Sequence, residues 1–264
     1  MGHLLGLPPE LLGFIAEDLH GDRTALRALS LVSRAFIQPS QTQLFRRINV
    51  RSAQINDYRS LGNVGEMRRR ISLESGGAQV LSYTRTLLLS LGQPLVYPQQ
   101  LDDIFDYLVA FKNVRQLIIS LFATHYVNHP LASPARYFAH FQPTLRSLRL
   151  STWLTNPWDL ITFLALFPLL EDVEIEMLDT YGLPPLPESE SEGSESTAIS
   201  PFRGSLRLRR FCHANTFVLE LLKSQVQYHT LSFPEMTVWS GIQELIVACA
   251  PTLRVLEFFN LTCE

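Results

Sequence analysis

Apolar residues recur at the first, fourth and sixth positions of short segments through the last two thirds of the chain. The clearest copies are residues 145–150, 170–175 and 253–258, which read LRSLRL, LEDVEI and LRVLEF. Looser copies occupy residues 84–89, 114–119, 208–213 and 228–233. Apolar residues that alternate with polar ones are typical of a β-strand with one buried and one exposed face. The pattern therefore predicts a series of short strands.

Amphipathic helical patterns lie between these strands. One face collects the apolar residues in segments 99–112, 159–167, 217–223 and 239–249. Strands that alternate with helices predict an α/β fold with a parallel sheet. The polar alternation of Ser147, Arg149 and Ser151 indicates that one face of this sheet is exposed. A doubly wound sheet, the competing interpretation, needs strands that are buried on both faces.

Residues 7–50 are predicted to form three short helices. Pro8 and Pro9 suit a first helical turn, and Pro39 is predicted to begin the third helix. Apolar residues at helical spacing share one face of the first helix (Leu11, Leu12, Ile15 and Leu19) and one face of the second (Leu26, Leu29, Val32 and Phe36). In the third helix, Leu44, Phe45 and Ile48 are predicted to face inward. Further apolar residues remain, namely Leu4, Leu5, Leu7, Phe14, Leu31 and Ile37. So small a module cannot bury all of them, and the surplus predicts a docked partner or a neighbouring domain.

Three motifs in this module carry a family resemblance. LPPELL at residues 7–12, LSLVSRAF at residues 29–36 and LFR at residues 44–46 occur in the order and at the distances of the F-box motif. The module resembles that motif, which in its family forms a three-helix hook for the Skp-type adaptor of Skp–cullin–F-box ubiquitin ligases. The resemblance implies these adaptor-binding residues: Leu7, Pro8, Glu10, Leu11, Ile15, Leu29, Val32, Ser33, Phe36, Leu44 and Phe45.

The repeated strand–helix units resemble a leucine-rich-repeat solenoid. The Asn or Cys expected after each strand is mostly missing, so the repeats are irregular. The expected fold class is therefore α/β, with an N-terminal three-helix F-box followed by an irregular leucine-rich-repeat-like solenoid, similar to fungal-type F-box proteins. The expected domains are residues 1–50 for the F-box, 51–82 for a connector with one short helix, and 83–264 for the solenoid.

Composition and charge narrow the classes of partner and compartment. The chain is 46% apolar and 18% charged with a formal net charge of −3, which indicates a globular protein and argues against nucleic acid as a partner. Cys212, Cys249 and Cys263 have neither disulfide-framework nor zinc spacing, which favours a reducing compartment. No secretory signal or membrane span is recognised, so a cytoplasmic or nuclear protein without membrane contact is expected. Residues 184–201, rich in Glu and Ser and without a basic residue, are expected to form a mobile acidic loop.

Catalytic signatures were not found in the sequence. It holds no G-x-S-x-G elbow, phosphate-binding glycine loop or H-E-x-x-H pair, so no catalytic, cofactor or metal site is predicted and an enzyme is not expected. The resemblance instead implies a substrate-recognition adaptor, whose helices bind the Skp-type adaptor and through it a cullin, and whose repeats bind a protein target. Two alternatives are a leucine-rich-repeat binding scaffold that acts outside any ligase and a hydrolase on a doubly wound sheet.

The exposed positions of the predicted strands form the candidate target-binding surface. Along the repeats, these positions pass from apolar and polar residues to an acidic patch flanked by arginines. The candidate target-binding residues are Arg149, Asp172, Glu174, Glu176 and Arg210. Such a face suits a protein or peptide surface with a basic segment. The last strand, near residues 255–259, is expected to leave an exposed edge.

Overall fold

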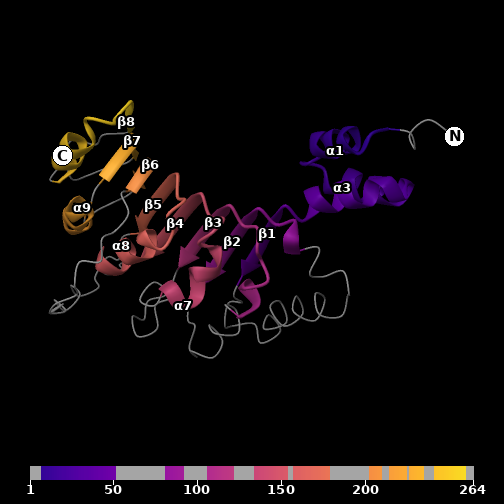
Figure 1. Ribbon diagram of the computed structural model, residues 1–264, viewed down its shortest axis with the longest axis horizontal. Helices are drawn as coiled ribbons and strands as arrows, with labels where there is room; N and C mark the ends of the chain where they lie inside the picture. The colour runs from indigo at the N-terminus through magenta and orange to yellow at the C-terminus, as the bar shows by residue number, and fades with distance from the viewer. Residues whose placement is uncertain are drawn as a thin grey trace.

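The computed structural model describes residues 7–51, 81–91, 106–121, 134–153, 157–178, 202–209, 214–224, 226–234 and 241–259. Three helices at the N-terminal end are followed by an eight-stranded parallel sheet with helices along one side (Figure 1). Most of the expected connector, the acidic segment 184–201 and Arg210 lie outside the described residues. Within them, no helix has both the length and the apolar character needed to cross a membrane.

Local sequence signals set the limits of the N-terminal helices, α1 (Pro9–Asp18), α2 (Arg23–Val32) and α3 (Arg34–Leu44). α1 starts with a proline, whose missing N–H costs nothing in the first turn. The Asp22 carboxylate caps α2 by accepting hydrogen bonds from the N–H groups of Thr24 and Ala25, both at 2.9 Å. Because α1 and α2 both pack against α3, the three helices form one unit.

The prediction that the third helix begins at Pro39 is wrong. Ser33 has an extended backbone, with φ −155° and ψ 144°, and its hydroxyl accepts a hydrogen bond from the Ala35 N–H at 3.3 Å. This cap ends α2 and starts α3 ahead of Pro39, which therefore lies inside α3. The core of the helical unit is made by apolar residues from all three helices: Leu12, Ala16, Leu26 and Phe36.

The eight strands of the sheet follow one another in chain order, and every neighbouring pair is parallel. They are β1 (Arg47–Arg51), β2 (Thr86–Leu91), β3 (Gln116–Leu121), β4 (Ser147–Trp153), β5 (Asp172–Leu178), β6 (Phe202–Arg209), β7 (Val226–Pro234) and β8 (Val255–Phe259). A doubly wound sheet reverses its strand order, so that alternative is excluded. β1 was not predicted, because its sequence directly follows α3 and falls inside the expected helical module.

Two rows of apolar side chains run across the sheet on its helix side. The register aligns Ile48, Leu87, Leu117, Leu148, Val173, Leu206, Leu231 and Leu256 in one row, and Val50, Leu89, Ile119, Leu150, Ile175, Leu208, Phe233 and Phe258 in the other. All of them are buried except the two residues of β8. The prediction that the fourth and sixth positions of the repeats at residues 84–89, 114–119, 145–150 and 170–175 are buried is thus confirmed, and their removal from water is the main contribution to the stability of the sheet. The same prediction is wrong for Leu256 and Phe258, because β8 is the last strand of the described sheet and nothing described packs over its outer side.

The predicted position of the fifth repeat is wrong. The sequence pattern centres this copy on residue 211, whereas β6 places Leu206 and Leu208 in the buried rows. The alternation of Leu206 and Leu208 is present in the sequence, and the pairing of β6 with β7 changes register between Gly204 and Ser205. Arg207 and Arg209 therefore occupy the opposite face of the sheet, beside Glu174 and Glu176 of β5.

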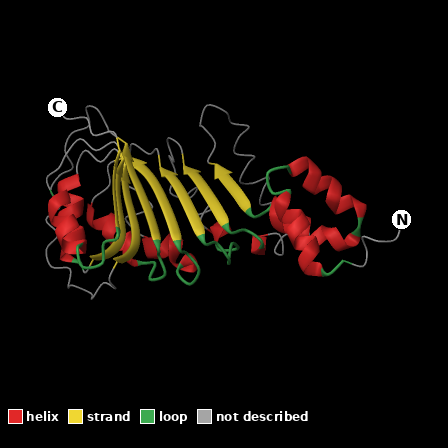
Figure 2. Cartoon of the chain, turned by 90° about the horizontal axis from the view of Figure 1, so that it is seen from above, coloured by secondary structure: helices red, strands yellow, loops and turns green. Residues whose placement is uncertain are grey.

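Helices cover one side of the sheet. α7 (Pro134–Phe138), α8 (Pro157–Ala165) and α9 (Ala214–Lys223) lie along this side, together with the 3-10 helix η4 (Ala139–Phe141) and α10 (Ile242–Cys249) (Figures 1 and 2). Phe163 of α8 meets Phe138 and Phe167 edge-on, with ring centroids 5.1 and 5.2 Å apart. The helices predicted near residues 159–167, 217–223 and 239–249 are confirmed as α8, α9 and α10, with shifted ends.

A half-buried histidine, His140, makes stability depend on pH. The His140 ring lies 3.8 Å from the Phe141 ring between centroids, and its Nε2 is buried without a partner among the described residues. Burial lowers the pKa of His140 from 6.5 to about 4, partly opposed by a hydrogen bond to the Leu108 backbone. Between these two pH values the unfolded chain binds a proton that the folded chain does not, so folding weakens as the pH falls.

We expect this histidine to cost about 2 kcal/mol of unfolding free energy between pH 6.5 and pH 4, discounted for partial solvent access. Urea unfolding across this range, compared with His140→Gln, isolates the effect from the carboxylates that both proteins share. The matched control is His229→Gln, because His229 is exposed. Parallel pH profiles for wild type and His140→Gln would contradict the expectation.

Candidate partner-binding surfaces

Apolar side chains are exposed on all three N-terminal helices. They are Leu11, Phe14 and Ile15 on α1, Leu31 and Val32 on α2, and Ile37 on α3. Leu31 is 87% exposed and Val32 is 68% exposed, which is unusual for large apolar residues of a folded unit. The expected surplus of apolar surface on this module is therefore confirmed for the described residues.

The residues implied as adaptor-binding differ in how much surface they offer. Pro8, Glu10, Leu11, Ile15 and Val32 are exposed, whereas Leu7, Leu29, Ser33, Leu44 and Phe45 are half-buried. Phe36 is only 2% exposed and belongs to the core, so its assignment as a contact residue is corrected. Helical spacing alone does not distinguish positions that pack into the core from neighbouring exposed positions on the same helix. Phe14, Leu31 and Ile37, which the sequence analysis counts among the surplus apolar residues, are exposed as well.

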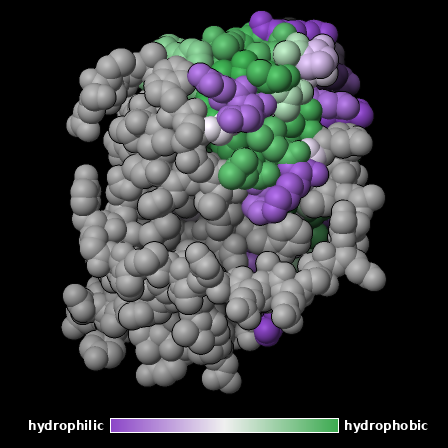
Figure 3. All heavy atoms as spheres, turned by 90° about the vertical axis from the view of Figure 1, so that its left-hand side faces the viewer, coloured by the Kyte–Doolittle hydropathy of each residue, from purple (hydrophilic) through white to green (hydrophobic). Residues whose placement is uncertain are grey.

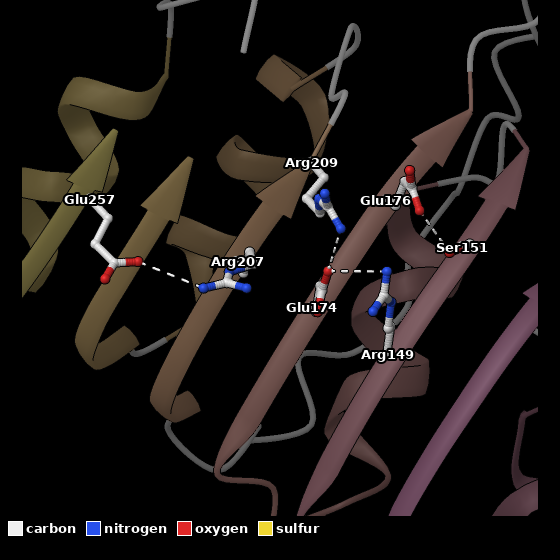
Figure 4. A network of polar contacts seen from close by, with 7 residues as sticks. All are labelled: Arg149, Ser151, Glu174, Glu176, Arg207, Arg209 and Glu257. Atoms are coloured by element: carbon white, nitrogen blue, oxygen red, sulfur yellow. Dashed lines mark hydrogen bonds and ion pairs between the residues drawn. The ribbon is translucent and has the colours of Figure 1, made fainter. Parts of the chain in front are cut away.

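Charged side chains meet on the open face of the sheet, opposite the helices (Figure 4). The register places Arg149 of β4 beside Glu174 of β5. Glu174 Oε1 lies 3.6 Å from Arg149 Nη2 and 3.2 Å from Arg209 Nη1 of β6, so one carboxylate joins three strands. The Ser151 hydroxyl donates a hydrogen bond to Glu176 Oε2 at 3.0 Å. Such partly exposed pairs contribute only about 0–1 kcal/mol each, so a binding partner can compete for their groups.

A third ion pair on this face spans β7. Arg207 Nη2 of β6 lies 3.7 Å from Glu257 Oε2 of β8, with Ser232 of β7 at the same level between them (Figure 4). Ser232 is only 2% exposed, and its hydroxyl oxygen has no hydrogen-bond partner among the described residues. Arg209 Nε is likewise buried and unpaired there. The β6–β8 part of the open face thus holds hydrogen-bonding groups that the described residues do not satisfy.

The structure brings together part of the predicted target-binding set. Arg149 and Glu174 form an ion pair, and Asp172 and Glu176 follow the same face of β5. Arg210 lies outside the described residues. The arginines that do border the acidic strand, Arg207 and Arg209, were missed. The sequence of β6, FRGSLRLR, carries the alternation that could have found them, had Leu206 been taken as the middle apolar position.

The last strand leaves an apolar surface at the C-terminal end of the sheet. β8 pairs with β7, and Val255, Leu256 and Phe259 are exposed. Val247 on the neighbouring α10 is 72% exposed. Apolar side chains gather at this end of the molecule, bordered by polar ones (Figure 3). The expected exposed edge is therefore confirmed for the described residues.

Comparison with protein-family models, curated proteins and solved structures found no match for this chain. Among the described residues, no group of three or more His, Cys, Asp or Glu is placed to hold a metal ion. The described surfaces support noncovalent binding: apolar burial on the N-terminal helices, and ion pairs and hydrogen bonds on the open sheet face.

Proposed function

We propose that this chain is a substrate-recognition adaptor of a Skp–cullin–F-box type ubiquitin ligase. The observation that carries the proposal is the apolar surface on α1 and α2, where Leu11, Ile15 and Val32 are exposed. Leu11 and Val32 belong to the motifs that resemble the F-box, and Ile15 lies one helical turn after Leu11 on α1. A folded helical unit that leaves such residues in water has surface suited to a hydrophobic partner, here the Skp-type adaptor and through it a cullin.

The sheet is proposed to be an irregular leucine-rich-repeat-like solenoid that presents a protein target-binding face. Two features support this assignment: the strands follow chain order, and α7, α8, α9 and α10 lie along one side of the sheet. The open face then carries the target-binding residues Arg149, Asp172, Glu174 and Glu176, joined by Arg207 and Arg209. In this proposal the chain itself performs no catalysis and needs no cofactor, because the ligase chemistry belongs to other subunits, and it acts in the cytoplasm or nucleus.

Co-expression with a Skp-type adaptor tests the proposal directly. We expect the two proteins to co-elute as a one-to-one complex in size-exclusion chromatography with light scattering, and the complex to pull down a cullin. A chain that elutes alone, folded and without the adaptor at micromolar concentration, contradicts the ligase assignment. That result would favour the alternative, a leucine-rich-repeat scaffold that acts outside any ligase.

A further inference from the structure

A row of arginines runs along the edge of the sheet where the strands begin. Arg46, Arg85, Arg115 and Arg146 each directly precede a strand, β1 to β4 in turn. The backbone holds them at one level: the Arg46 carbonyl accepts hydrogen bonds from the N–H groups of Arg85 and Thr86 at 2.9 and 3.0 Å. The same pair of backbone hydrogen bonds links Arg85 to Arg115 and Arg115 to Arg146. We call these four residues the arginine row.

The arginine row is a run of like charges on adjacent strands. Neighbouring backbones are about 4.8 Å apart, so the row is about 14 Å long. Like charges placed directly opposite one another destabilise a sheet. Arg46, Arg115 and Arg146 are exposed and Arg85 is half-buried, so the charges remain open to solvent and to a partner. The exposed Lys112 and Arg47, close in sequence to Arg115 and Arg46, add to the positive charge.

Among the described residues, carboxylates pair only with the two ends of the row. Arg46 pairs with Glu17 of α1 at 3.2 Å, and Arg146 pairs with Glu171, the residue at the same level before β5. Between them, Arg85 Nη1 donates to the Asn113 carbonyl at 3.2 Å and forms no ion pair among the described residues. For the Arg115 side chain the described residues provide no partner at all. The two middle guanidinium groups therefore retain N–H donors that fit carboxylates, as those of their neighbours already do.

We infer that the arginine row is a binding site for an acidic polypeptide segment of a partner protein. Carboxylates of the segment pair with Arg85 and Arg115, between the intramolecular pairs made by Arg46 and Arg146. Binding lowers the electrostatic repulsion between the arginines of the row. This lowering favours the complex over the free chain. The site lies at the start of the strands and uses none of the residues of the open-face ion pairs. It goes beyond the proposed function and does not depend on it.

Fluorescence anisotropy with labelled peptides tests the inference on the full chain. The probe is a short peptide of alternating glutamate and serine, and its matched control carries lysine in place of glutamate. We expect the glutamate peptide to bind about tenfold more tightly or better, with affinity that falls as salt rises. Arg85→Gln/Arg115→Gln should weaken it about tenfold. The control variant Arg23→Gln/Arg27→Gln removes the same charge from exposed positions of α2 and should leave binding unchanged.

Three results would overturn the inference. The first is equal or tighter binding of the lysine peptide, and the second is equal loss of binding in both double variants. The third is tighter binding of a single-stranded oligonucleotide or an anionic phospholipid vesicle than of the peptide, with the same dependence on Arg85 and Arg115. Adaptor co-elution measured on the same preparations separates this outcome from failure of the proposed function.

Discussion

Replacing Leu11 and Val32 together with Asp should abolish capture of a Skp-type adaptor while leaving the chain folded. Both side chains are exposed in the free chain, so the new carboxylates remain hydrated there and cost little. At a hydrophobic contact they would be buried without a counter-charge, at a cost of several kcal/mol. Because about 1.4 kcal/mol corresponds to a tenfold change in affinity, we expect a loss of about a hundredfold or more. Isothermal titration calorimetry with the purified adaptor measures it.

Val247→Asp is the matched control for this double variant. Val247 is as exposed as Val32, but it lies on α10 at the opposite end of the molecule (Figure 1). The same substitution there should leave adaptor affinity unchanged. Circular dichroism establishes that all three proteins are folded. Full adaptor affinity in the Leu11→Asp/Val32→Asp protein would place the adaptor contact elsewhere or remove it altogether.

Gly204→Ala should cost about 3 kcal/mol or more of unfolding free energy, a large effect for the addition of one methyl group. Gly204 has φ +96°, which disfavours any side chain. A Cβ atom there would lie 1.8 Å from the Glu171 carbonyl oxygen and 2.6 Å from its carbon. The obstacle is backbone, held by the hydrogen bond from the Ser205 N–H to the same carbonyl at 2.7 Å, so it cannot rotate away.

The loss should be local, because each strand pairs only with its neighbours in the chain. Hydrogen exchange should show faster exchange in β6 to β8 and near-native protection in β2 to β4. Gly13→Ala is the matched control: a Cβ at Gly13 meets no atom within 4 Å, and alanine favours the α1 interior by about 1 kcal/mol. Wild-type protection throughout the Gly204→Ala protein would show that the β5–β6 junction tolerates a side chain.

The parts of the fold predicted correctly depend on local alternation. Leu148 and Leu150 were assigned to the buried face because polar residues separate them, and the structure agrees. The incorrect helix and strand predictions arise where backbone geometry, and not the spacing of apolar residues, sets the ends of an element. The Ser33 cap places α3 ahead of Pro39, and the positive φ at Gly204 accompanies the register shift in β6. Neither feature changes the spacing of apolar residues.

Predicting the candidate surfaces from sequence meets the same limit, because exposure depends on packing and register as well as on spacing. Glu174 was identified because its repeat was correctly placed, whereas Arg209 was missed because the repeat was centred on residue 211 instead of Leu206. Phe36 was assigned to a partner contact because it belongs to the motif, but the packing of α3 buries it. The arginine row was not predicted, since no residue in it is unusual by itself. It arises only when hydrogen bonds bring Arg85 and Arg115 to one level.

The strict chain order of the strands also sets the length of the open face, and hence the number of peptide residues that could lie along it. Eight strands about 4.8 Å apart give the face a length of about 34 Å. An extended peptide rises about 3.4 Å per residue, so about ten residues would lie along the full face. We expect affinity on such a surface to accumulate over many weak contacts along the peptide. Insertion or deletion of a single strand–helix unit would change the length of the bound segment by one or two residues and leave the remaining contacts in place.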